Sequence, residues 1–383
     1  MRVGIDLTAL LPLATGVDNY MLRLVGGLGR VDRETAYTLF VNLEDRRRLG
    51  DALPPNFTVV PACLRPRPAR LAFQQALLPV AASALRLDVL HSPAFLMPLL
   101  RGTPRHVLTV HDMTFFTLPD CHIPMRRSPT FLRGVTASIR RADLVVVPSE
   151  AVRRDVLALV PGVLPDRVRV IPLGIGEEFR PPPDGTPRPD RPYVLFVGTL
   201  EPRKNVEAVV ESYRRLVLEA DVEEDLLLVG RLGWDYHRLL ARLEAPELRG
   251  RVRRLGYVTQ DELVALYGGA RLFVYPSLGE GFGFPPLEAL ACGTATIVTD
   301  SSSLAENLRG AAELVPPDDV PALTETMRRF LRDPALRAAR RTVGLERAAR
   351  FRWEDTARAM RACYAELAGR YASRAGLAPG PAT

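Results

Sequence analysis

Short apolar runs alternate with longer amphipathic segments along most of the chain. Runs of four or five residues rich in β-branched side chains are typical of strands, and apolar residues three or four positions apart mark a helix face. In the first half the strand-like runs are Val3–Leu7, Tyr37–Val41, Phe57–Val60, Asp88–His91, Val107–His111, Leu144–Pro148 and Val168–Pro172. The alternation predicts a parallel sheet with helices on both faces.

A proline-rich break divides the pattern. Residues 180–192 read RPPPDGTPRPDRP, with proline at six of thirteen positions, so this segment can continue neither a helix nor a central strand. The alternation then restarts with Tyr193–Val197, Leu226–Val229, Val252–Leu255, Leu272–Tyr275, Thr296–Val298 and Glu313–Val315. We therefore expect a second doubly wound α/β domain, followed by helices from about Pro321 to Tyr371 that break near Pro334 and Phe351–Trp353.

Length and charge limit the class of protein. The 383 residues exceed the roughly 250–300 that one core supports, which agrees with two domains. The formal charge of +7 suits nucleic acid, an anionic membrane or a phosphate-bearing substrate. The chain has no zinc-finger spacing and no RNA-binding aromatic motif, so nucleic acid is the least favoured of these partners. Its four cysteines have no metal-ligand spacing.

The sequence carries no targeting or spanning signal. No stretch approaches the roughly 18–20 apolar residues of a transmembrane helix. The first residues, MRVGIDL, run directly into a strand pattern and lack the apolar region and cleavage site of a signal peptide. We therefore expect a cytoplasmic protein.

The only lysine of the chain, Lys204, directly follows Arg203. A strand is expected to end at Gly198 and a helix to begin near Asn205, a good N-cap residue. A guanidinium, a compact ammonium and a helix N-terminus together make a positive site that suits a diphosphate. The alternative is that both cations are solvated surface charges.

The strongest motif is Glu280-Gly-Phe-Gly-Phe-Pro-Pro-Leu-Glu288, between an expected strand and an expected helix over Pro286–Ala291. Its glycines can expose backbone N–H groups to a ligand. In the first helical turn, Glu288 can accept two vicinal hydroxyls, and Glu280 can hold a sugar hydroxyl. Two carboxylates without a nearby cation would be unusual as structure alone, so a ligand site is favoured.

Two weaker candidates lie in the first half. Gly16 opens a helix after an expected strand, where backbone N–H groups attract anions; a plain turn is the alternative. His111 ends another expected strand and can donate to a sugar oxygen; core packing is the alternative. His91 also ends a strand, and there a structural hydrogen bond is the better explanation.

Seven motifs follow one another in the order expected of one enzyme family: Thr15-Gly16, His111-Asp112, Val197–Asn205, Leu227–Arg231, Leu255–Val258, Glu280–Glu288 and Phe351–Glu354. On the basis of these motifs, the chain resembles the retaining glycosyltransferases of family four over about residues 2–370. The resemblance implies the GT-B fold, in which two Rossmann-like doubly wound domains face each other across a cleft and the last helix crosses back. Residues 1–180, completed by a helix at about 355–372, would form the acceptor-side domain, and residues 190–354 the donor-binding domain.

The resemblance also implies roles for individual residues. The expected catalytic set is His111 near the anomeric carbon, Arg203 and Lys204 on the donor diphosphate, and Glu280 on the transferred sugar. Glu288 would hold the ribose hydroxyls. Further donor contacts are expected at Gly16, Gly198, Thr199, Arg231, Tyr257, Val258, Phe282, Gly283, Phe284 and Leu287. Family members often carry arginine where this chain has Thr199, and Arg203 can supply that charge.

The mechanism follows from what neutralises the leaving group. The chain has no Asp-x-Asp, the metal–nucleotide clamp of the other large glycosyltransferase fold, so we expect no metal cofactor. Arg203 and Lys204 would stabilise the leaving diphosphate by charge already in place. The hypothesis is front-face transfer with retention, in which the diphosphate oxygen accepts the acceptor's proton and Glu280 positions the sugar.

The expected partners are a GDP- or UDP-sugar donor and a glycan or lipid-linked acceptor. The forms EPRKN and VGRLGW resemble those of mannosyltransferases that use GDP-mannose, which implies GDP-mannose as the donor. Arg65, Arg67 and Arg70 flank the apolar stretch Leu71–Leu85, and Arg101 follows Phe95–Leu100. Domain packing is the preferred explanation of these segments, and peripheral contact with an anionic membrane is the alternative.

Other functions remain open on the same two-domain plan. A sugar-nucleotide epimerase would form product from the donor alone. A phosphorylase would need inorganic phosphate, and many use a pyridoxal Schiff base on lysine, for which only Lys204 is present. A non-catalytic binding homologue is a third alternative, against which the paired acidic and basic residues argue.

Overall fold

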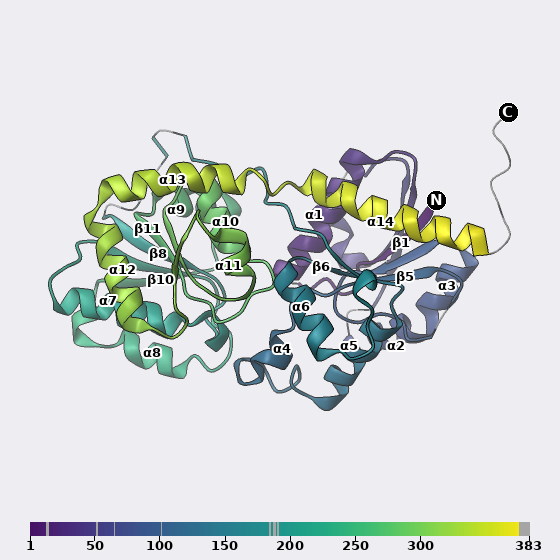
Figure 1. Cartoon of the computed structure of the whole chain (residues 1–383), viewed down its shortest axis with the longest axis horizontal. Coiled ribbons are helices and arrows are strands. Elements are labelled where there is room, and N and C mark those ends of the chain that lie inside the picture. Colours follow the sequence, from purple (N-terminus) through teal and green to yellow (C-terminus); the bar gives the residue numbers. More distant parts are fainter. Residues whose placement is uncertain are drawn as a thin grey trace. The chain divides into compact units, whose positions relative to one another are not determined.

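The computed structural model describes residues 1–12, 15–50, 53–64, 66–100, 102–183, 185–186, 189 and 191–374. The chain forms two compact units (Figure 1). The first comprises Met1–Met113, Ser128–Gly174 and the chain from Arg352 onward, and the second comprises Thr114–Arg127 and Ile175–Phe351. Each unit is described by itself below.

The first unit contains a seven-stranded sheet of order β3-β2-β1-β4-β5-β6-β7, in which every neighbouring pair is parallel. Its strands are β1 (Arg2–Asp6), β2 (Ala36–Asn42), β3 (Phe57–Ala62), β4 (Val89–Ser92), β5 (Arg105–Thr109), β6 (Leu144–Val147) and β7 (Val168–Val170). The strands are largely buried on both faces, which agrees with their apolar runs. Every run predicted as a strand in this half is confirmed.

The helices of the first unit are α1 (Gly16–Val31), α2 (Arg67–Ala72), α3 (Leu78–Ala84), α5 (Pro129–Arg141), α6 (Glu150–Leu159) and α14 (Trp353–Arg374). Helix α14 packs on α1, β4 and β5 (Figure 1). Gly27 makes this close approach possible, because a Cβ there would lie 3.0 Å from the Trp353 carbonyl oxygen. The predicted return of the last helix to the first half of the chain is thereby confirmed.

The second unit contains a six-stranded parallel sheet of order β10-β9-β8-β11-β12-β13. Its strands are β8 (Tyr193–Val197), β9 (Asp225–Val229), β10 (Val252–Gly256), β11 (Leu272–Tyr275), β12 (Thr296–Thr299) and β13 (Glu313–Val315). The six runs predicted as strands in this half are confirmed, and both units have the doubly wound α/β plan expected from the sequence.

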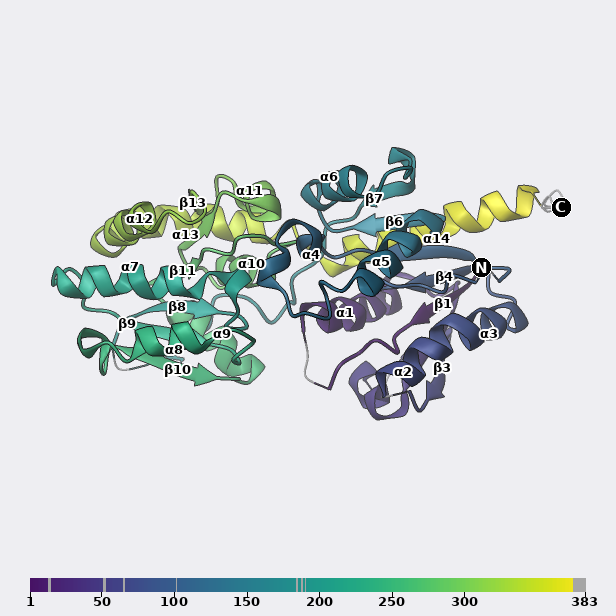
Figure 2. The same cartoon turned by 90° about the horizontal axis from the view of Figure 1, so that it is seen from below.

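Helices cover both faces of this second sheet (Figure 2). The helices of the second unit are α4 (Thr114–Thr117), α7 (Val206–Leu218), α8 (His237–Leu243), α9 (Gln260–Gly269), α10 (Phe284–Ala291), α11 (Ser302–Leu308), α12 (Val320–Arg332) and α13 (Pro334–Ala348). Helices α7 and α12 pack together, and α10 packs on α9 and α13. The predicted breaks near Pro334 and Phe351–Trp353 lie where α12 and α13 end.

The division of the chain differs in two places from the expected domains. The change of unit lies between Gly174 and Ile175, before the proline-rich segment rather than within it. The segment Thr114–Arg127 belongs to the second unit, although it lies inside the range 1–180 assigned to the first domain. The first difference arises because Gly174 packs on the start of α14, where a Cβ would lie 2.2 Å from the Trp353 nitrogen.

The strand order determines which loops can form a site. In an open parallel sheet, ligands bind beyond the carboxyl ends of the strands where the order reverses. In the second unit this point lies between the neighbours β8 and β11. The loops that leave these two strands contain Arg203 and Lys204 on one side and Glu280 on the other.

Candidate active site

The loop after β8 brings Arg203 and Lys204 to the sheet edge in a 3₁₀ turn over Pro202–Lys204. The turn is closed by the Lys204 amide, which donates to the Glu201 carbonyl at 3.0 Å. The loop also packs closely against the end of β9. A Cβ at Gly230 would lie 2.1 Å from the Gly198 oxygen, so the two backbones are in contact there. Both cations therefore sit on backbone that neighbouring strands fix in place.

Asn205 stands directly before α7, as predicted, but its side chain does not cap that helix. Its backbone is left-handed, with φ of 51°, and its side-chain Nδ2 donates to Asp318 Oδ1 at 3.2 Å. The capping role inferred from residue type is wrong, because the chain must reverse direction sharply between the 3₁₀ turn and the helix. Asparagine tolerates this conformation better than most residues.

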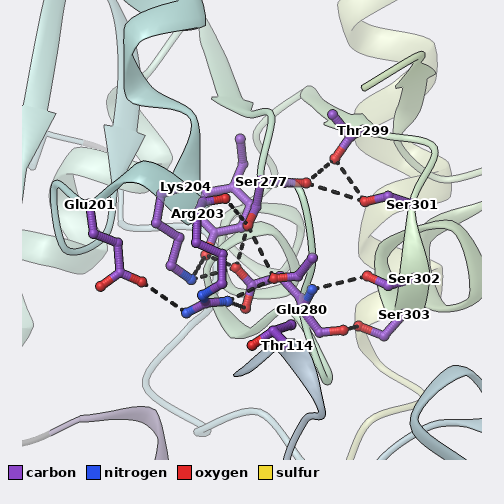
Figure 3. A network of polar contacts seen from close by, with 12 residues as sticks. Thr114, Glu201, Arg203, Lys204, Ser277, Glu280, Thr299, Ser301, Ser302 and Ser303 are labelled. Carbon is purple, nitrogen blue, oxygen red and sulfur yellow. Dashed lines mark hydrogen bonds and ion pairs between the residues drawn. The ribbon is translucent and has the colours of Figure 1, made fainter. Parts of the chain in front are cut away.

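The loop after β11 is bonded directly to the loop after β8. The Arg203 carbonyl accepts hydrogen bonds from the Leu278 amide at 2.9 Å and from Ser277 Oγ at 3.1 Å. The Glu280 amide is held by Ser302 Oγ at 3.0 Å, and its carbonyl by Ser303 Oγ at 2.8 Å. Two loops more than seventy residues apart in sequence thus form one rigid frame (Figure 3).

The side chain of Glu280 lies at the centre of a dense polar cluster (Figure 3). Its Oε1 accepts from Ser277 at 2.7 Å, from Tyr275 at 2.9 Å and from the Lys204 ammonium. Its Oε2 lies 3.0 Å from Arg203 Nη1. Glu280 has no cation near it in sequence, but tertiary folding places both predicted cations on this one carboxylate.

Arg203 is held from three sides. Besides Glu280, it bonds to the Gly279 carbonyl at 2.7 Å and to Glu201 Oε1 at 3.0 Å. The compact positive site expected from the sequence is therefore already balanced, because two acidic side chains face two basic ones. An incoming anion has to share these cations with Glu280 and Glu201.

Burial and charge shift the pKa values of the cluster. Burial by itself raises the pKa of Glu280, but the charges of Arg203 and Lys204 outweigh it and hold the pKa at about 2. Burial and the nearby Arg203 lower the pKa of Lys204, while Glu280 and Glu201 act in the opposite direction. Burial raises the pKa of Glu201. Glu280 is consequently the firmly ionised carboxylate of the cluster.

Glu288 lies in the second turn of α10, because the helix begins at Phe284 and not at Pro286. The side chain is half-buried and accepts a hydrogen bond from the Tyr267 hydroxyl at 2.9 Å. Gly283 precedes the helix with φ of 92°, and a Cβ there would lie 2.6 Å from Leu304 Cδ2. Glycine is thus required at this turn on both conformational and steric grounds.

Two apolar residues of this motif have buried side chains. Leu287 is fully buried in the core of the unit, and its expected contact with the donor stays a prediction. Phe282 is 4% exposed and packs edge-on against Phe284 and Phe351. The Phe282 carbonyl is taken by Asn307 Nδ2 at 2.8 Å. The aromatic ring of Phe282 is thus buried in the core of the second unit.

The expected nucleobase residues follow β9 and β10, which are neighbours in the sheet. The two strand ends are bonded, since the Gly230 amide donates to the Gly256 carbonyl at 2.8 Å. Arg231 is exposed, Val258 is half-buried, and Tyr257 is 79% exposed. A large aromatic ring left in solvent beside a strand end is available to a planar ligand.

In the first unit, Gly16 is the first residue of α1, but a carboxylate already occupies this helix start. Asp18 accepts hydrogen bonds from the amides of Leu11 and Thr15, both at 2.7 Å. Thr15 Oγ1 in turn accepts from the Asp18 amide, which completes a capping box. A negative side chain at this position competes with any anion, so an anion-binding role for Gly16 is weakened.

His111 lies two residues beyond the end of β5 and is half-buried. Its Nε2 donates to the Pro93 carbonyl at 2.7 Å, and its ring meets the rings of Tyr20 and Phe95 edge-on. Because a carbonyl only accepts, Nε2 carries a proton. The predicted structural role of His91 is confirmed, since its ring nitrogens bond Tyr364 and Thr109, each at 2.7 Å.

The sequence does not single out Tyr275, Ser277 or Glu201, although all three complete the cluster. Ser277 lies three residues before Glu280, and Glu201 two before Arg203. A search for every polar side chain on the two motif loops would have found these two. Tyr275 looks like an ordinary strand residue, and no local signal marks it.

The expectation of membrane contact rests partly on residues outside the described ones, namely Arg65, Arg101 and the side chain of Arg67. Leu77, Val80 and Leu100 are large apolar residues of the first unit that are at least 60% exposed. No helix in the described ranges is long and apolar enough to cross a membrane. Among these same residues, no group of three or more potential metal ligands occurs.

Comparisons with known proteins match both halves of the chain. Residues 14–179 match the family described as Glycosyltransferase Family 4, and residues 182–346 match Glycosyl transferases group 1. O-antigen chain mannosyltransferase B of Escherichia coli is 32% identical over 275 residues, which are 70% of this chain and 71% of that protein. Serotype-specific mannosyltransferase WbdA of Escherichia coli is also 32% identical, over 66% of this chain, but the match spans only 32% of that protein.

A solved structure agrees on the fold. Sucrose-phosphate synthase from Thermosynechococcus elongatus superposes with a TM-score of 0.79 at 22% identity, over 96% of this chain and 99% of that one. The likeness extends over both doubly wound units.

Proposed function

Because this chain belongs to the glycosyltransferases of the GT-B fold, we propose that it transfers a hexose from a nucleotide-diphosphate sugar to a glycan or lipid-linked acceptor, with retention at the anomeric carbon. Mannose is the favoured sugar, which the 32% identity to an O-antigen chain mannosyltransferase supports. The single observation that carries the proposal is the cluster in which Arg203 and Lys204 converge on Glu280 at the ends of β8 and β11.

Arg203 and Lys204 bind the donor diphosphate. Without donor, Glu280 holds both cations at a fixed place on a frame that needs no rearrangement to receive phosphate oxygens. When the diphosphate arrives, its charge replaces part of the carboxylate's attraction, and the two cations are shared. The chain thus avoids leaving a buried ammonium and a guanidinium unpaired before the substrate binds.

Glu280 and Glu288 bind hydroxyl groups of the donor. Glu280 accepts from the transferred sugar, and Glu288, fixed by Tyr267, accepts from the ribose. The backbone at Gly283 contributes N–H groups at the start of α10. Arg231, Tyr257 and Val258 lie beside the base, where the exposed Tyr257 ring stacks on it.

The transfer step uses charge already in place. An acceptor hydroxyl attacks the anomeric carbon from the face that the diphosphate leaves, and the leaving oxygen takes the acceptor's proton. Arg203 and Lys204 stabilise the negative charge that develops on the diphosphate, so no metal ion is part of the proposed step. His111, with its protonated Nε2 already used by Pro93, orients the sugar beside the reacting carbon.

We place the reaction in the cytoplasm, where the acceptor is reached in solution or at the inner face of the membrane. The exposed side chains Leu77, Val80 and Leu100 of the first unit support a peripheral contact of this kind. A lipid-linked acceptor would then be presented to the unit that carries His111.

The test is a product analysis with GDP-mannose, UDP-glucose and other nucleotide sugars, each with a panel of glycan and lipid-linked acceptors. We expect one donor to give a new glycosidic bond with retained anomeric configuration, measured by NMR. Product from the donor alone would identify an epimerase, and dependence on inorganic phosphate would identify a phosphorylase. Nucleotide-sugar binding without any turnover would indicate a non-catalytic homologue and refute the proposal.

A further inference from the structure

One segment of the chain belongs to a different unit from the residues directly before and after it in the sequence. Residues 114–127, called the strap below, directly follow Met113 of the first unit and precede Ser128 of the same unit. They are nevertheless part of the second unit. The strap contains the short helix α4 and a 3₁₀ turn over Pro119–Cys121.

The strap packs directly on the Glu280 loop. A Cβ at Gly279 would lie 3.0 Å from Leu118 Cδ1 and 3.2 Å from Thr114 Cγ2, so the absence of a side chain at residue 279 favours this close approach of loop and strap. Figure 3 shows Thr114 beside Glu280 and Arg203. The Gly279 carbonyl, in contact with Arg203 at 2.7 Å, is therefore the point where the strap reaches the cation cluster.

His122 anchors the strap at its other end. This side chain is buried, and its Nε2 lies 2.9 Å from Thr114 Oγ1. The ring stacks on Trp234, with 6.4 Å between centroids, and meets Phe115 edge-on. Neither the hydrogen bond nor the stack belongs to the cluster described above.

Trp234 joins this anchor to the loop after β8. The adjacent Gly233 donates to the Leu200 carbonyl at 3.0 Å, and a Cβ at Gly233 would lie 2.9 Å from Thr199 Cγ2. The strap therefore spans from the loop that precedes Arg203 to the loop that carries Glu280. Both loops contribute to the cluster, and the strap braces them from outside.

We propose that the strap is a positioning element of the donor site, with His122 and Trp234 holding Thr114 and Leu118 against Gly279. This inference rests on the proposed function. If the contacts of His122 are lost, the Gly279 carbonyl is no longer fixed. Arg203 then loses one of the contacts that orient its guanidinium toward the diphosphate. His122 and Trp234 are positioning residues, because they act on the donor through Gly279 and Arg203.

The experiment compares His122→Ala with a matched control, His237→Ala, which alters an exposed histidine of the same unit. The first readout is tryptic cleavage after Arg126 and Arg127 in the unliganded protein, followed by mass spectrometry. We expect cleavage at these two sites to be about tenfold faster in His122→Ala, because cleavage requires local opening of the strap. The control should match the wild type.

The second readout is the dissociation constant of GDP and UDP, measured by calorimetry. We expect about tenfold weaker binding of the preferred nucleotide in His122→Ala. Equal affinity in His122→Ala and wild type, or unchanged cleavage, would overturn the strap proposal alone. If the wild type binds neither nucleotide, the proposed function fails, and the role of the strap in donor binding fails with it.

A second pair of variants keeps the proposal testable if His122→Ala does not fold. Gly279→Val introduces a side chain where the strap now lies, and we expect it to weaken nucleotide binding. Leu118→Ala in the same chain removes the atom closest to the new Cβ and should restore much of the affinity. Absence of rescue would contradict the assigned contact, and Gly369→Ala, which meets no atom within 4 Å, is the matched control.

Discussion

Replacing Glu280 by glutamine tests the central electrostatic argument. The amide is nearly isosteric and can still accept hydrogen bonds from Ser277 and Tyr275. It removes the negative charge, however, and leaves Arg203 and Lys204 facing a neutral group. Two largely buried cations without their shared anion should destabilise the second unit.

The expected magnitude follows from the pKa of Glu280. The pKa of Glu280 is about 2, compared with an ordinary value of 4.5. At about 1.4 kcal/mol per pKa unit, this difference corresponds to about 3 kcal/mol of stabilisation of the folded state. Since the folded pKa is the lower one, this stabilisation is fully present above pH 4.5 and is lost as the pH falls toward 2. The difference between wild type and Glu280→Gln should narrow over the same range.

The assay uses the two tryptophans of the chain, one in each unit. In a Trp353→Phe background, Trp234 alone reports urea-induced unfolding of the second unit. We expect Glu280→Gln to lower the free energy of unfolding by about 3 kcal/mol. Glu288→Gln is the control, and its loss should be smaller because its Tyr267 partner is uncharged.

The binding of pyrophosphate gives a second prediction, in which the variant gains affinity although it loses stability. With Glu280 neutral, the two cations should bind pyrophosphate more tightly, so the ligand should raise the stability of Glu280→Gln more than that of wild type. A loss of stability below about 1 kcal/mol, or weaker pyrophosphate binding in the variant, would refute the reasoning. The first result would mean that Glu280 does not stabilise the two cations, and the second that its charge does not compete with the ligand for them.

Three further predictions concern single contacts. Lys204→Ala should lower the turnover number by about a hundredfold or more with the fold intact, measured with the preferred donor, and near-normal transfer would contradict the assignment. Tyr257→Ala should raise the donor KM about tenfold without changing the unfolding midpoint, since the residue is 79% exposed; an unchanged KM would argue against stacking. Tyr364→Phe removes a hydrogen bond to the buried His91 and should lower the stability of the first unit, reported by Trp353 fluorescence, by about 1 kcal/mol; no change would show that this bond contributes nothing.

The sequence predicted both sheets because parallel strands buried on two faces must be continuous apolar runs. Each run from Val3–Leu7 to Glu313–Val315 became a strand, since short apolar runs between amphipathic helices fit buried parallel strands. Proline located the break near Pro334 for an equally local reason. The two loops that carry the cluster were also identified, because charged residues at strand ends stand out against apolar runs.

The sequence could not predict which distant strands and loops become neighbours in the fold. Strands β8 and β11 are neighbours only because of the crossover order of the sheet, and this adjacency places Lys204 on Glu280. Read alone, each motif suggested a separate role, a free positive site and an unpaired carboxylate. The side-chain cap expected of Asn205 was wrong for a related reason, since the backbone conformation there is set by the surrounding structure.

The amino-acid sequence by itself determined the two doubly wound units, their strand ends and the residue types available there, because these depend on periodicity and composition over a few residues. Only the tertiary structure decided that the cations are held by Glu280 and that residues 114–127 belong to the second unit. Contacts of this kind depend on which segments meet in space, and nothing in the local pattern of the strap distinguishes packing on one sheet from packing on the other.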